Sequence, residues 1–517
     1  MSALNGTPNS APAGFDPIRD LPAGFFRAYA ELHRLFSPRQ LALVAARAQG
    51  LERAHQGQLP SHLPPTDATT GSWRITLPAW CADQRNQMTG PADDAELVVK
   101  MLNSGAPGVM IDLEDSMANQ WDNTLRGHAN AVAALHGTLG YDDAKRNSRV
   151  TIKPSGVVCW VRVRGLHLHQ AGVVPGELTS ASLFDLALLV HNLDVTKLKH
   201  PIAIYVPKSE SADEALWWRD VFRRLAEDKG LPPDAIKCMA LVESHPMAYR
   251  MEEFLYNLRD HILGLNLGRW DYMASLIHFN LPNPLWVLPD RNTIPHDVAF
   301  FQRLRELLPE ICHKRGALAI GGMTALFPSR TDPELNSRAM AALEKDKRNE
   351  AAALMDGAWT GHPDQNAVAV AQFPAPNQGF VRPANPERFP DLRPAPIGVG
   401  IHSEAGTRAA VRVTIQYRAG VLLGNGASLI EGYMEDLATD RIYRLMLAQR
   451  VLHRDVVKTA DEAGHLVVHT PAYLTRIYDE ELARLLPRCS DDRERDCYRA
   501  ARQLSEAMIV AGQHDPV

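Results

Sequence analysis

The sequence predicts an α/β protein, a (β/α)8 TIM barrel with an N-terminal helical segment and an all-helical C-terminal domain. Three observations lead to this prediction. Eight short apolar runs alternate with stretches of helical periodicity, charged residues directly follow most of these runs, and a proline-rich stretch separates them from a last region with helical spacing only. Apolar strands that alternate with helices are typical of a parallel sheet covered on both faces. Eight such units favour a closed barrel over an open sheet.

Residues 1–75 are expected to hold a leader and a helical segment. Apolar side chains recur at helical spacing over residues 23–51, among them Phe26, Tyr29 and Leu32. A polar connector that contains proline and glycine follows over residues 55–73. This pattern predicts one or two helices that precede the barrel.

The barrel is expected over residues 76–373. Its eight predicted strands are residues 86–89, 108–112, 157–163, 202–206, 237–242, 262–267, 317–321 and 355–359. Among the helices between them, residues 211–229 have the clearest ends. Ser211 and Glu214 have the spacing of a capping box, and Gly230 follows as a C-terminal cap.

Residues 374–396 contain seven prolines, and proline is incompatible with the interior of a helix or a sheet. We therefore expect a linker there. Residues 397–517 are expected to form the C-terminal domain, with helical spacing over residues 405–423, 434–450, 480–486 and 493–510.

Composition limits the kinds of partner that the protein is expected to have. Of its 517 residues 45% are hydrophobic and 22% are charged, which is ordinary for a globular protein. The net charge of −5 gives no electrostatic reason to expect a nucleic acid or an anionic membrane as partner. No apolar run approaches the roughly 18 residues of a membrane helix, and the first residues lack the pattern of an export signal. The six cysteines show no CxxC spacing, so we expect reduced thiols in a cytoplasmic protein.

Two acidic residues follow neighbouring predicted strands. Glu243 comes directly after residues 237–242, and Asp271 comes shortly after residues 262–267. The carboxyl ends of parallel barrel strands meet at one rim, where barrel enzymes carry their active sites. Two oxygen ligands there, completed by water and a small substrate, suit Mg²⁺ better than a soft metal. The sequence therefore predicts a magnesium site formed by Glu243 and Asp271.

Further charged residues mark other strand ends. The second strand ends in Asp112-Leu-Glu-Asp115, the fourth is followed by Lys208, and Arg162 and Arg164 alternate onto one face at the end of the third. An arginine beside a metal would stabilise an oxyanion formed on the substrate. The predicted rim therefore combines acids with basic residues.

Each of these residues also has a structural explanation, as a helix cap or as an ion-pair partner. We interpret Arg162 as the partner of a barrel carboxylate rather than as a substrate ligand, and Trp270 as a packing residue that fixes the loop of Asp271. His167 and His169 form an HxH pair, but no further ligand lies near them in the sequence. We interpret them as polar loop residues rather than metal ligands.

The segment Gly268-Arg-Trp-Asp-Tyr272 resembles the signature of the malate synthase family. Other segments resemble that family in the same order along most of the chain: Met88-Thr-Gly-Pro91, Leu102-Asn-Ser-Gly-Ala106, Asp112-Leu-Glu-Asp-Ser116, Trp121-Asp-Asn123, Val287-Leu-Pro-Asp-Arg291, Cys312-His-Lys-Arg-Gly-Ala317, Gly321-Gly-Met323, Asp356-Gly-Ala-Trp359 with His362-Pro363, and Gly424-Asn-Gly426 with Met434-Glu-Asp-Leu-Ala-Thr439. The chain length and the absence of a large insert in the barrel are similar to the shorter, A-type malate synthases.

The resemblance implies a barrel with a helical clasp before it and a helical plug after it. It implies a Claisen condensation of acetyl-CoA with glyoxylate, followed by thioester hydrolysis to malate, as in the glyoxylate bypass. Mg²⁺ is the implied cofactor. The family's metal ligands fall on Glu243 and Asp271, its catalytic arginine on Arg164 and its catalytic aspartate on Asp436.

These positions suit the implied chemistry. Asp436 would remove a proton from the acetyl methyl group, and Arg164 would stabilise the enolate oxygen. Without the resemblance, Asp436 is interpreted as a solvated helix residue. Trp359 and Pro363 are expected to be walls for the acetyl arm of acetyl-CoA.

The chain departs from the family mildly at Leu241-Val-Glu-Ser244 and more clearly at three other places. Gln87 stands where glutamate is usual, Leu166 where tryptophan is usual, and residues 427–433 differ from the usual loop before the aspartate. These differences bear on which 2-oxo acid is used and leave the reaction class unchanged.

Two other functions remain as alternatives. One is a carbon–carbon lyase for CoA thioesters, of the malyl-CoA or citrate lyase β type; the C-terminal domain with Asp436 argues against it, because those lyases are much shorter. The other is a non-catalytic relative that acts as a binding protein. The presence of all four implied chemical residues argues against that function.

Overall fold

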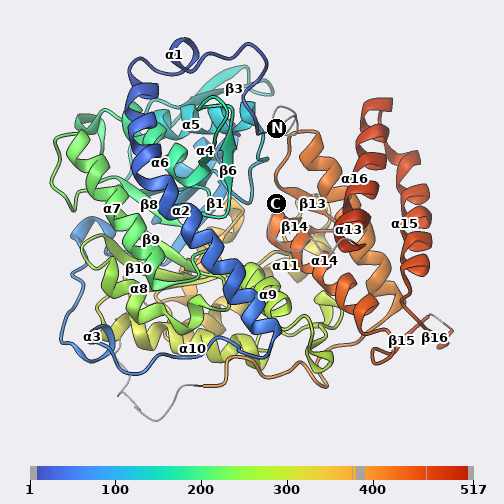
Figure 1. The fold of residues 1–517 in the computed structure, drawn as a ribbon. Coiled ribbons are helices and arrows are strands. Elements are labelled where there is room, and N and C mark those ends of the chain that lie inside the picture. Colours follow the sequence, from blue (N-terminus) through green and yellow to red (C-terminus); the bar gives the residue numbers. More distant parts are fainter. Residues whose placement is uncertain (1–8, 375, 380–389, 462, 511–517) are drawn as a thin grey trace. The chain divides into compact units, whose positions relative to one another are not determined.

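A computed structural model describes residues 9–374, 376–379, 390–461 and 463–510 (Figure 1). These residues fall into two compact units. The first unit takes its residues from Met1–Gly50, Ser61–Gly268 and Arg305–Arg388, and the second from Leu51–Pro60, Arg269–Leu304 and Phe389–Val517.

The first unit is built on a closed barrel of eight parallel strands, in the order β1-β12-β11-β10-β9-β8-β5-β2. The strands are β1 (Asn86–Pro91), β2 (Gly108–Asp112), β5 (Val158–Arg162), β8 (Ala203–Val206), β9 (Lys237–Val242), β10 (Ile262–Leu267), β11 (Leu318–Met323) and β12 (Gly357–Thr360). All eight predicted strands are present, and every strand but β1, β11 and β12 lies within one residue of the predicted ends. The predicted barrel is confirmed.

Helices alternate with these strands as predicted. They are α4 (Ala95–Leu102), α5 (Trp121–Leu135), α6 (Ala181–Asn192), α7 (Ala212–Asp228), α8 (Met251–Asn257), α9 (Arg269–Phe279), α10 (Ala299–Lys314), α11 (Pro333–Ala352) and α12 (Asn366–Gln372). The predicted start of α7 is confirmed, because the Ser211 side chain accepts a hydrogen bond from the Glu214 N–H. The predicted capping box is only half formed, since Glu214 Oε2 accepts from the Glu210 N–H rather than from that of Ser211.

The N-terminal helical segment is also present. It consists mainly of the long helix α2 (Phe25–His55), and the shorter helices α1 (Pro17–Asp20) and α3 (Asp67–Thr70) flank it in the sequence. Two small hairpins were not predicted, β3 (Gly140–Asp143) with β4 (Ser148–Thr151) and β6 (His169–Ala171) with β7 (Leu178–Ser180). Their strands are only three or four residues long, which is too short for a clear alternation of apolar residues.

Buried side chains of three barrel strands meet at the amide of Gln87, on β1. Gln87 Oε1 accepts hydrogen bonds from the Tyr205 hydroxyl at 2.6 Å and from the Trp359 indole N–H at 2.9 Å. The rings of Tyr205 and Trp359 meet edge to face, with centroids 5.3 Å apart. Gln87 therefore satisfies two buried donors without bringing a charge into the barrel.

The second unit has a helical core. Its main helices are α13 (Glu404–Leu422), α14 (Leu437–Leu452), α15 (Pro471–Leu485) and α16 (Asp492–Val510). Buried apolar side chains such as Ile415, Met446 and Ile477 pack between them. Helix α9 belongs to this unit and packs against α14. The predicted C-terminal helices are thus confirmed.

Two short hairpins interrupt these helices. They are β13 (Ser428–Ile430) with β14 (Tyr433–Glu435), and β15 (Thr459–Ala460) with β16 (Leu466–Val467). The predicted helix 434–450 therefore begins at Leu437, because the preceding residues pair as a strand. The predicted helix 480–486 begins earlier than expected, at Pro471, where Thr470 supplies the N-cap.

Of the predicted linker at residues 374–396, residues 375 and 380–389 lie outside the described residues. The domain boundaries that the sequence suggests, at 75, 373 and 397, stay predictions. In the described part of the chain no helix has both the length and the apolar character needed to cross a bilayer.

Candidate active site

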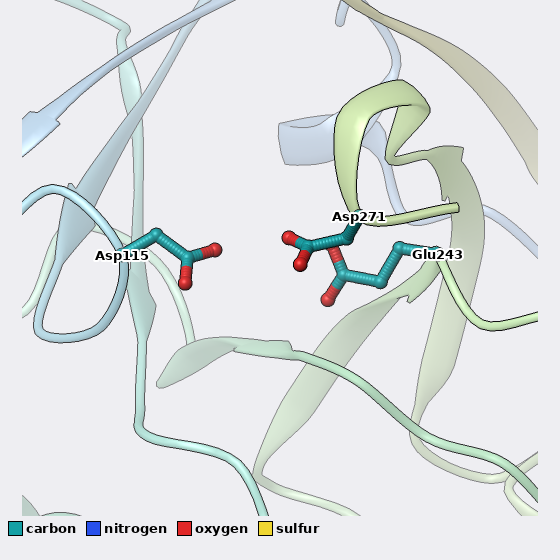
Figure 2. A group of neighbouring side chains, drawn as sticks. All are labelled: Asp115, Glu243 and Asp271. Carbon is teal, nitrogen blue, oxygen red and sulfur yellow. The ribbon is translucent and has the colours of Figure 1, made fainter. Parts of the chain in front are cut away.

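Three buried carboxylates gather where barrel strands end. Asp115 lies in the loop after β2, Glu243 directly follows β9, and Asp271 is in the first turn of α9, after β10. Each offers one oxygen, and these oxygens lie within 4.8 Å of one another. Figure 2 shows the carboxylates of Glu243 and Asp271 side by side, with Asp115 directed towards them. The structure therefore brings the two predicted metal ligands together and adds a third acid.

Glu243 is held in place by residues that follow the two strands adjacent to β9, which are β8 and β10. Its Oε1 accepts a hydrogen bond from the Lys208 backbone N–H at 2.7 Å. A Cβ at Gly268 would lie 2.6 Å from both the Cβ and Oε2 of Glu243, so this close approach requires glycine. Since β9 and β10 are neighbours in the barrel, the strand ends alone bring Gly268 and Glu243 together.

Lys208 connects this group to the loop after β2. Its ammonium donates to both Asp115 oxygens, at 2.8 and 2.6 Å, and to Glu114 Oε2 at 3.2 Å. Its backbone adopts φ = +45°, a left-handed conformation that is costly for a residue with a side chain. Such strain persists only where the surroundings impose it, and here the N–H and the ammonium are both fixed by acids.

The two acids of this loop respond oppositely to burial and charge. Burial raises the pKa of Glu114, and the Lys208 ammonium only partly opposes this. Burial also acts to raise the pKa of Asp115, but Lys208 and Arg162 outweigh it and hold that pKa below its usual range. Asp115 is therefore ionised beside Glu243 and Asp271.

Arg162 is the last residue of β5 and pairs with Asp112, the last residue of β2, and with Asp115 after it. It donates from Nε and Nη2 to Asp112 at 2.7 and 2.6 Å, and from Nη1 to Asp115 at 3.1 Å. Its guanidinium carbon lies 5.7 Å from the centre of the Trp359 ring. These contacts agree with the interpretation of Arg162 as the partner of a barrel carboxylate, and they place it beside one of the three clustered acids.

Arg164 lies beyond the end of β5 and has other partners. It is fully buried, and it donates to both oxygens of Asp185 at 2.9 and 2.7 Å, to Asn119 Oδ1 at 2.9 Å and to Gln170 Oε1 at 2.9 Å. Burial raises the pKa of Asp185, but Arg164 and His128 outweigh it and hold it at about 2. The hydrogen bonds found for Arg164 among the described residues do not reach the three clustered acids.

Asp436 is the N-cap of α14. Its Oδ1 accepts hydrogen bonds from the backbone N–H groups of Ala438 and Thr439, at 3.1 and 3.3 Å, and its own N–H donates to the Thr439 hydroxyl. The carboxylate is half-buried, not solvated as the sequence alone suggests. A capping box of this kind fixes where the side chain of its first residue points.

Trp359 and Pro363, the predicted walls for the acetyl arm, differ in accessibility. Trp359 is on β12, only 7% exposed, and its indole is held by Gln87. Pro363 is half-buried and begins the 3-10 turn Pro363–Gln365 that follows this strand.

The sequence pattern does not show that Asp115 joins Glu243 and Asp271, or that Lys208 pairs with Asp115. Both Asp115 and Lys208 are charged residues that follow predicted strands, and this position is the signal that the sequence offers. What the sequence could not give is the pairing between them, because the side-chain contacts of two loops 93 residues apart depend on the barrel closing.

Buried carboxylates from three strand ends, with one lysine and one arginine beside them, place this protein in the class of barrel proteins whose rim has the oxygen donors that a hard divalent cation prefers. Comparisons with known proteins narrow this class. The family model for the malate synthase TIM barrel domain matches residues 158–381, and that for the malate synthase C-terminal domain matches residues 402–515. The chain belongs to the malate synthase family.

Individual relatives agree with this family. The chain is 38% identical over 464 residues to malate synthase of Streptomyces clavuligerus, covering 86% of this chain and 85% of that protein. It is 35% identical over 477 residues to malate synthase A of Escherichia coli strain K12, covering 90% of this chain and 87% of that protein. Among solved structures, a pyruvate and acetyl-CoA ternary complex of Haloferax volcanii malate synthase is similar in fold, with a TM-score of 0.51 and 16% identity over 72% of this chain and 91% of that chain.

Proposed function

We propose that this protein condenses acetyl-CoA with glyoxylate and hydrolyses the resulting thioester, which yields malate and CoA. The observation that carries this proposal is the convergence of Glu243 and Asp271 in a chain of the malate synthase family. The reaction would place the protein in the glyoxylate bypass. Its six cysteines are free thiols, which supports a place in the cytoplasm.

We propose Mg²⁺ as the cofactor, held by Glu243 and Asp271. All the donor atoms are carboxylate oxygens, which hard cations prefer. Asp115, Glu243 and Asp271 are only 3–5% exposed, so water screens the repulsion between their charges poorly. When bound, Mg²⁺ supplies a Lewis acid for the aldehyde of glyoxylate. Asp115 lies beside the two ligands and remains bound to Lys208 and Arg162.

Asp436 is proposed as the base. Its carboxylate takes a proton from the methyl group of acetyl-CoA, and the electron pair of that C–H bond forms the enolate. The enolate carbon then bonds to the aldehyde carbon of glyoxylate, whose oxygen becomes an alkoxide and takes up a proton. Water attacks the thioester carbonyl, the C–S bond breaks, and CoA and malate leave. The cap hydrogen bonds to Ala438 and Thr439 orient the carboxylate for the first step.

We propose Arg162, in place of Arg164, as the residue that stabilises the enolate and alkoxide oxygens. Asp112 and Asp115 accept three of the hydrogen bonds that its five N–H groups can donate, whereas Arg164 gives four to Asp185, Asn119 and Gln170. A cation beside the clustered acids acts on charge that develops there. Arg164 would instead support the loop after β5.

Trp359 and Pro363 remain our proposed walls for the acetyl arm. Trp359 has little exposed surface, and Pro363 would supply the more accessible wall.

A thiol-release assay tests the proposed function. We expect CoA release from acetyl-CoA with glyoxylate and Mg²⁺, and much slower release with pyruvate or with oxaloacetate, or after chelation of the metal. Chromatography of the products should find malate together with free CoA. Malyl-CoA as the end product would point to a lyase instead, and the absence of any CoA release would refute the proposal.

A further inference from the structure

A buried arginine lies between the two segments that carry the proposed base and one proposed metal ligand. Arg291 is 3% exposed, at the start of the 3-10 turn Arg291–Thr293 in the second unit. Its Nη1 donates to Glu435 Oε2 at 2.7 Å and its Nη2 donates to Glu435 Oε1 at 3.0 Å. Glu435, 1% exposed, is the residue directly before Asp436. A two-pronged pair of this kind fixes direction as well as distance.

Aromatic rings surround the same guanidinium. Its carbon lies 4.9 Å from the centre of the Trp270 ring, 4.8 Å from that of Tyr443 and 5.6 Å from that of Tyr433. These distances are within the range of cation–π attraction, which is strongest where water is excluded. Trp270 directly precedes Asp271.

The backbone that carries Arg291 is itself fixed to α14. The Leu288 N–H donates to Gln449 Oε1 at 3.0 Å, and Gln449 Nε2 donates to the Trp286 carbonyl at 2.7 Å. Arg450 Nη2 donates to Asp290 Oδ1 at 2.5 Å. Since Asp436 caps this same helix and directly follows Glu435, Arg291 and the proposed base are both held to α14.

We propose that Arg291 is a positioning residue that sets the place of Asp436 relative to Asp271. One guanidinium binds the residue before the base through its N–H groups and lies over the ring of the residue before the metal ligand. This inference rests on the proposed function, since it takes the roles of Asp271 and Asp436 from there. A lysine would keep the charge but not the planar, two-pronged geometry.

Three variants distinguish a positioning role of Arg291 from a contribution to the stability of the fold alone. Arg291→Met removes both contacts, and we expect kcat to fall about 100-fold, the scale of a base displaced by about 1 Å, with KM for both substrates within threefold. The Kd for Mn²⁺, measured by calorimetry without substrates, should rise about tenfold, as for supporting residues around metal sites. Glu435→Gln leaves Arg291 against Trp270, so kcat should fall while the Kd for Mn²⁺ stays unchanged. Arg291→Lys should recover part of the kcat that Arg291→Met loses.

Arg408→Met is the matched control. Arg408 pairs with the buried Glu481 at 3.1 Å, between α13 and α15 of the same unit, and it contacts neither Glu435 nor Trp270 in the contacts found among the described residues. We expect the Arg408→Met variant to have a lower Tm than the wild type, with kcat and the Kd for Mn²⁺ unchanged. If Arg291→Met at a temperature below its Tm keeps kcat within threefold of the wild type, the proposal is overturned. If Arg291→Met does not fold, Glu435→Gln decides, and an unchanged kcat in that variant overturns the proposal.

The two proposals fail in distinguishable ways. A wild-type protein that releases no CoA from acetyl-CoA and glyoxylate contradicts the proposed function. A wild-type protein that is active, with Arg291→Met and Glu435→Gln equally active, contradicts only the role of Arg291.

Discussion

The absence of a side chain at residue 268 decides where Glu243 can lie. The 2.6 Å that would separate a Cβ at Gly268 from two atoms of Glu243 is shorter than any stable carbon contact, so a larger residue must move the carboxylate. Lys208 also fixes Glu243, because its backbone N–H, in a strained left-handed conformation, donates to the Glu243 carboxylate. Gly268 and Lys208 thus determine where Glu243 lies in the proposed metal site, although neither is a proposed metal ligand or catalytic residue.

Replacement of Gly268 by alanine tests this constraint. We expect Gly268→Ala to weaken Mn²⁺ binding about tenfold, because the displaced Glu243 loses its ligand geometry, a loss typical of changes around metal ligands. Calorimetric titration of the substrate-free protein measures it. Gly156→Ala is the control, since an added Cβ there meets nothing within 4 Å. Equal Mn²⁺ affinity in both variants would show that Gly268 is not needed.

Arg162, at the end of β5, and Arg164, beyond it, are distinguished by replacement with lysine, which keeps the charge. We expect Arg162→Lys to lower kcat about 100-fold, the cost of losing an oxyanion donor. Arg164→Lys should leave kcat within a few fold but lower the Tm, because Asp185 loses a two-pronged partner in a fully buried position. Steady-state kinetics and thermal unfolding of both variants check this, and the opposite pattern would return the catalytic role to Arg164.

At the scale of elements, the hairpin β13–β14 leads into the helix that Asp436 caps. Its turn has Glu431 at φ = +52° and Gly432 at φ = +88°, as two-residue hairpins require. Tyr433–Glu435 then pairs as a strand before α14 starts at Leu437. Asp436 thus serves as the junction of two elements and, we propose, as the base.

Substitutions of Asp436 separate these two roles. Asparagine caps helices as well as aspartate does, so Asp436→Asn should keep the Tm while turnover is lost. Asp436→Ala should lose turnover and about 1 kcal/mol of stability as well, because the cap is removed. Thermal unfolding and the CoA-release assay measure the two effects. Near-normal turnover in Asp436→Asn would mean that the base lies elsewhere.

The limits of sequence-based prediction are clearest at such junctions. The alternation rule for strands placed Arg162 and Arg164 on one face, but β5 ends at Arg162, so the rule no longer applies to Arg164. Met434 and Glu435 have helical spacing with the residues after them, yet they pair with β13 because the turn at Glu431 and Gly432 returns the chain. The barrel strands were predictable because both of their faces are buried, which leaves a strong apolar signal.

At the scale of the whole molecule, the barrel brings Asp115, Glu243 and Asp271 together from distant parts of the sequence. Strand order alone predicts that their strand ends share a rim, so Glu243 and Asp271 were predictable as a pair. The partners Lys208 and Arg162 depend on side-chain packing across the rim, which no spacing encodes. Three acids that converge in a buried site repel one another, and a bound cation should therefore stabilise the folded chain.

Metal-dependent unfolding measures this stabilisation. At a Mg²⁺ concentration of about 100 times Kd, the folded state should gain about 2.7 kcal/mol, which raises the Tm. Glu243→Gln should lose this increase, whereas Glu431→Gln, an exposed acid in the hairpin turn, should retain it. A Tm that does not respond to Mg²⁺ in the wild type would argue against a resident cation.

The position of the cation is the central claim, and anomalous diffraction from a crystal soaked in Mn²⁺ tests it most directly. We expect one strong peak bound by carboxylate oxygens of Glu243 and Asp271, with Asp115 next to it. A peak at other residues, or no peak between Glu243 and Asp271 at saturating Mn²⁺, would contradict the proposed site.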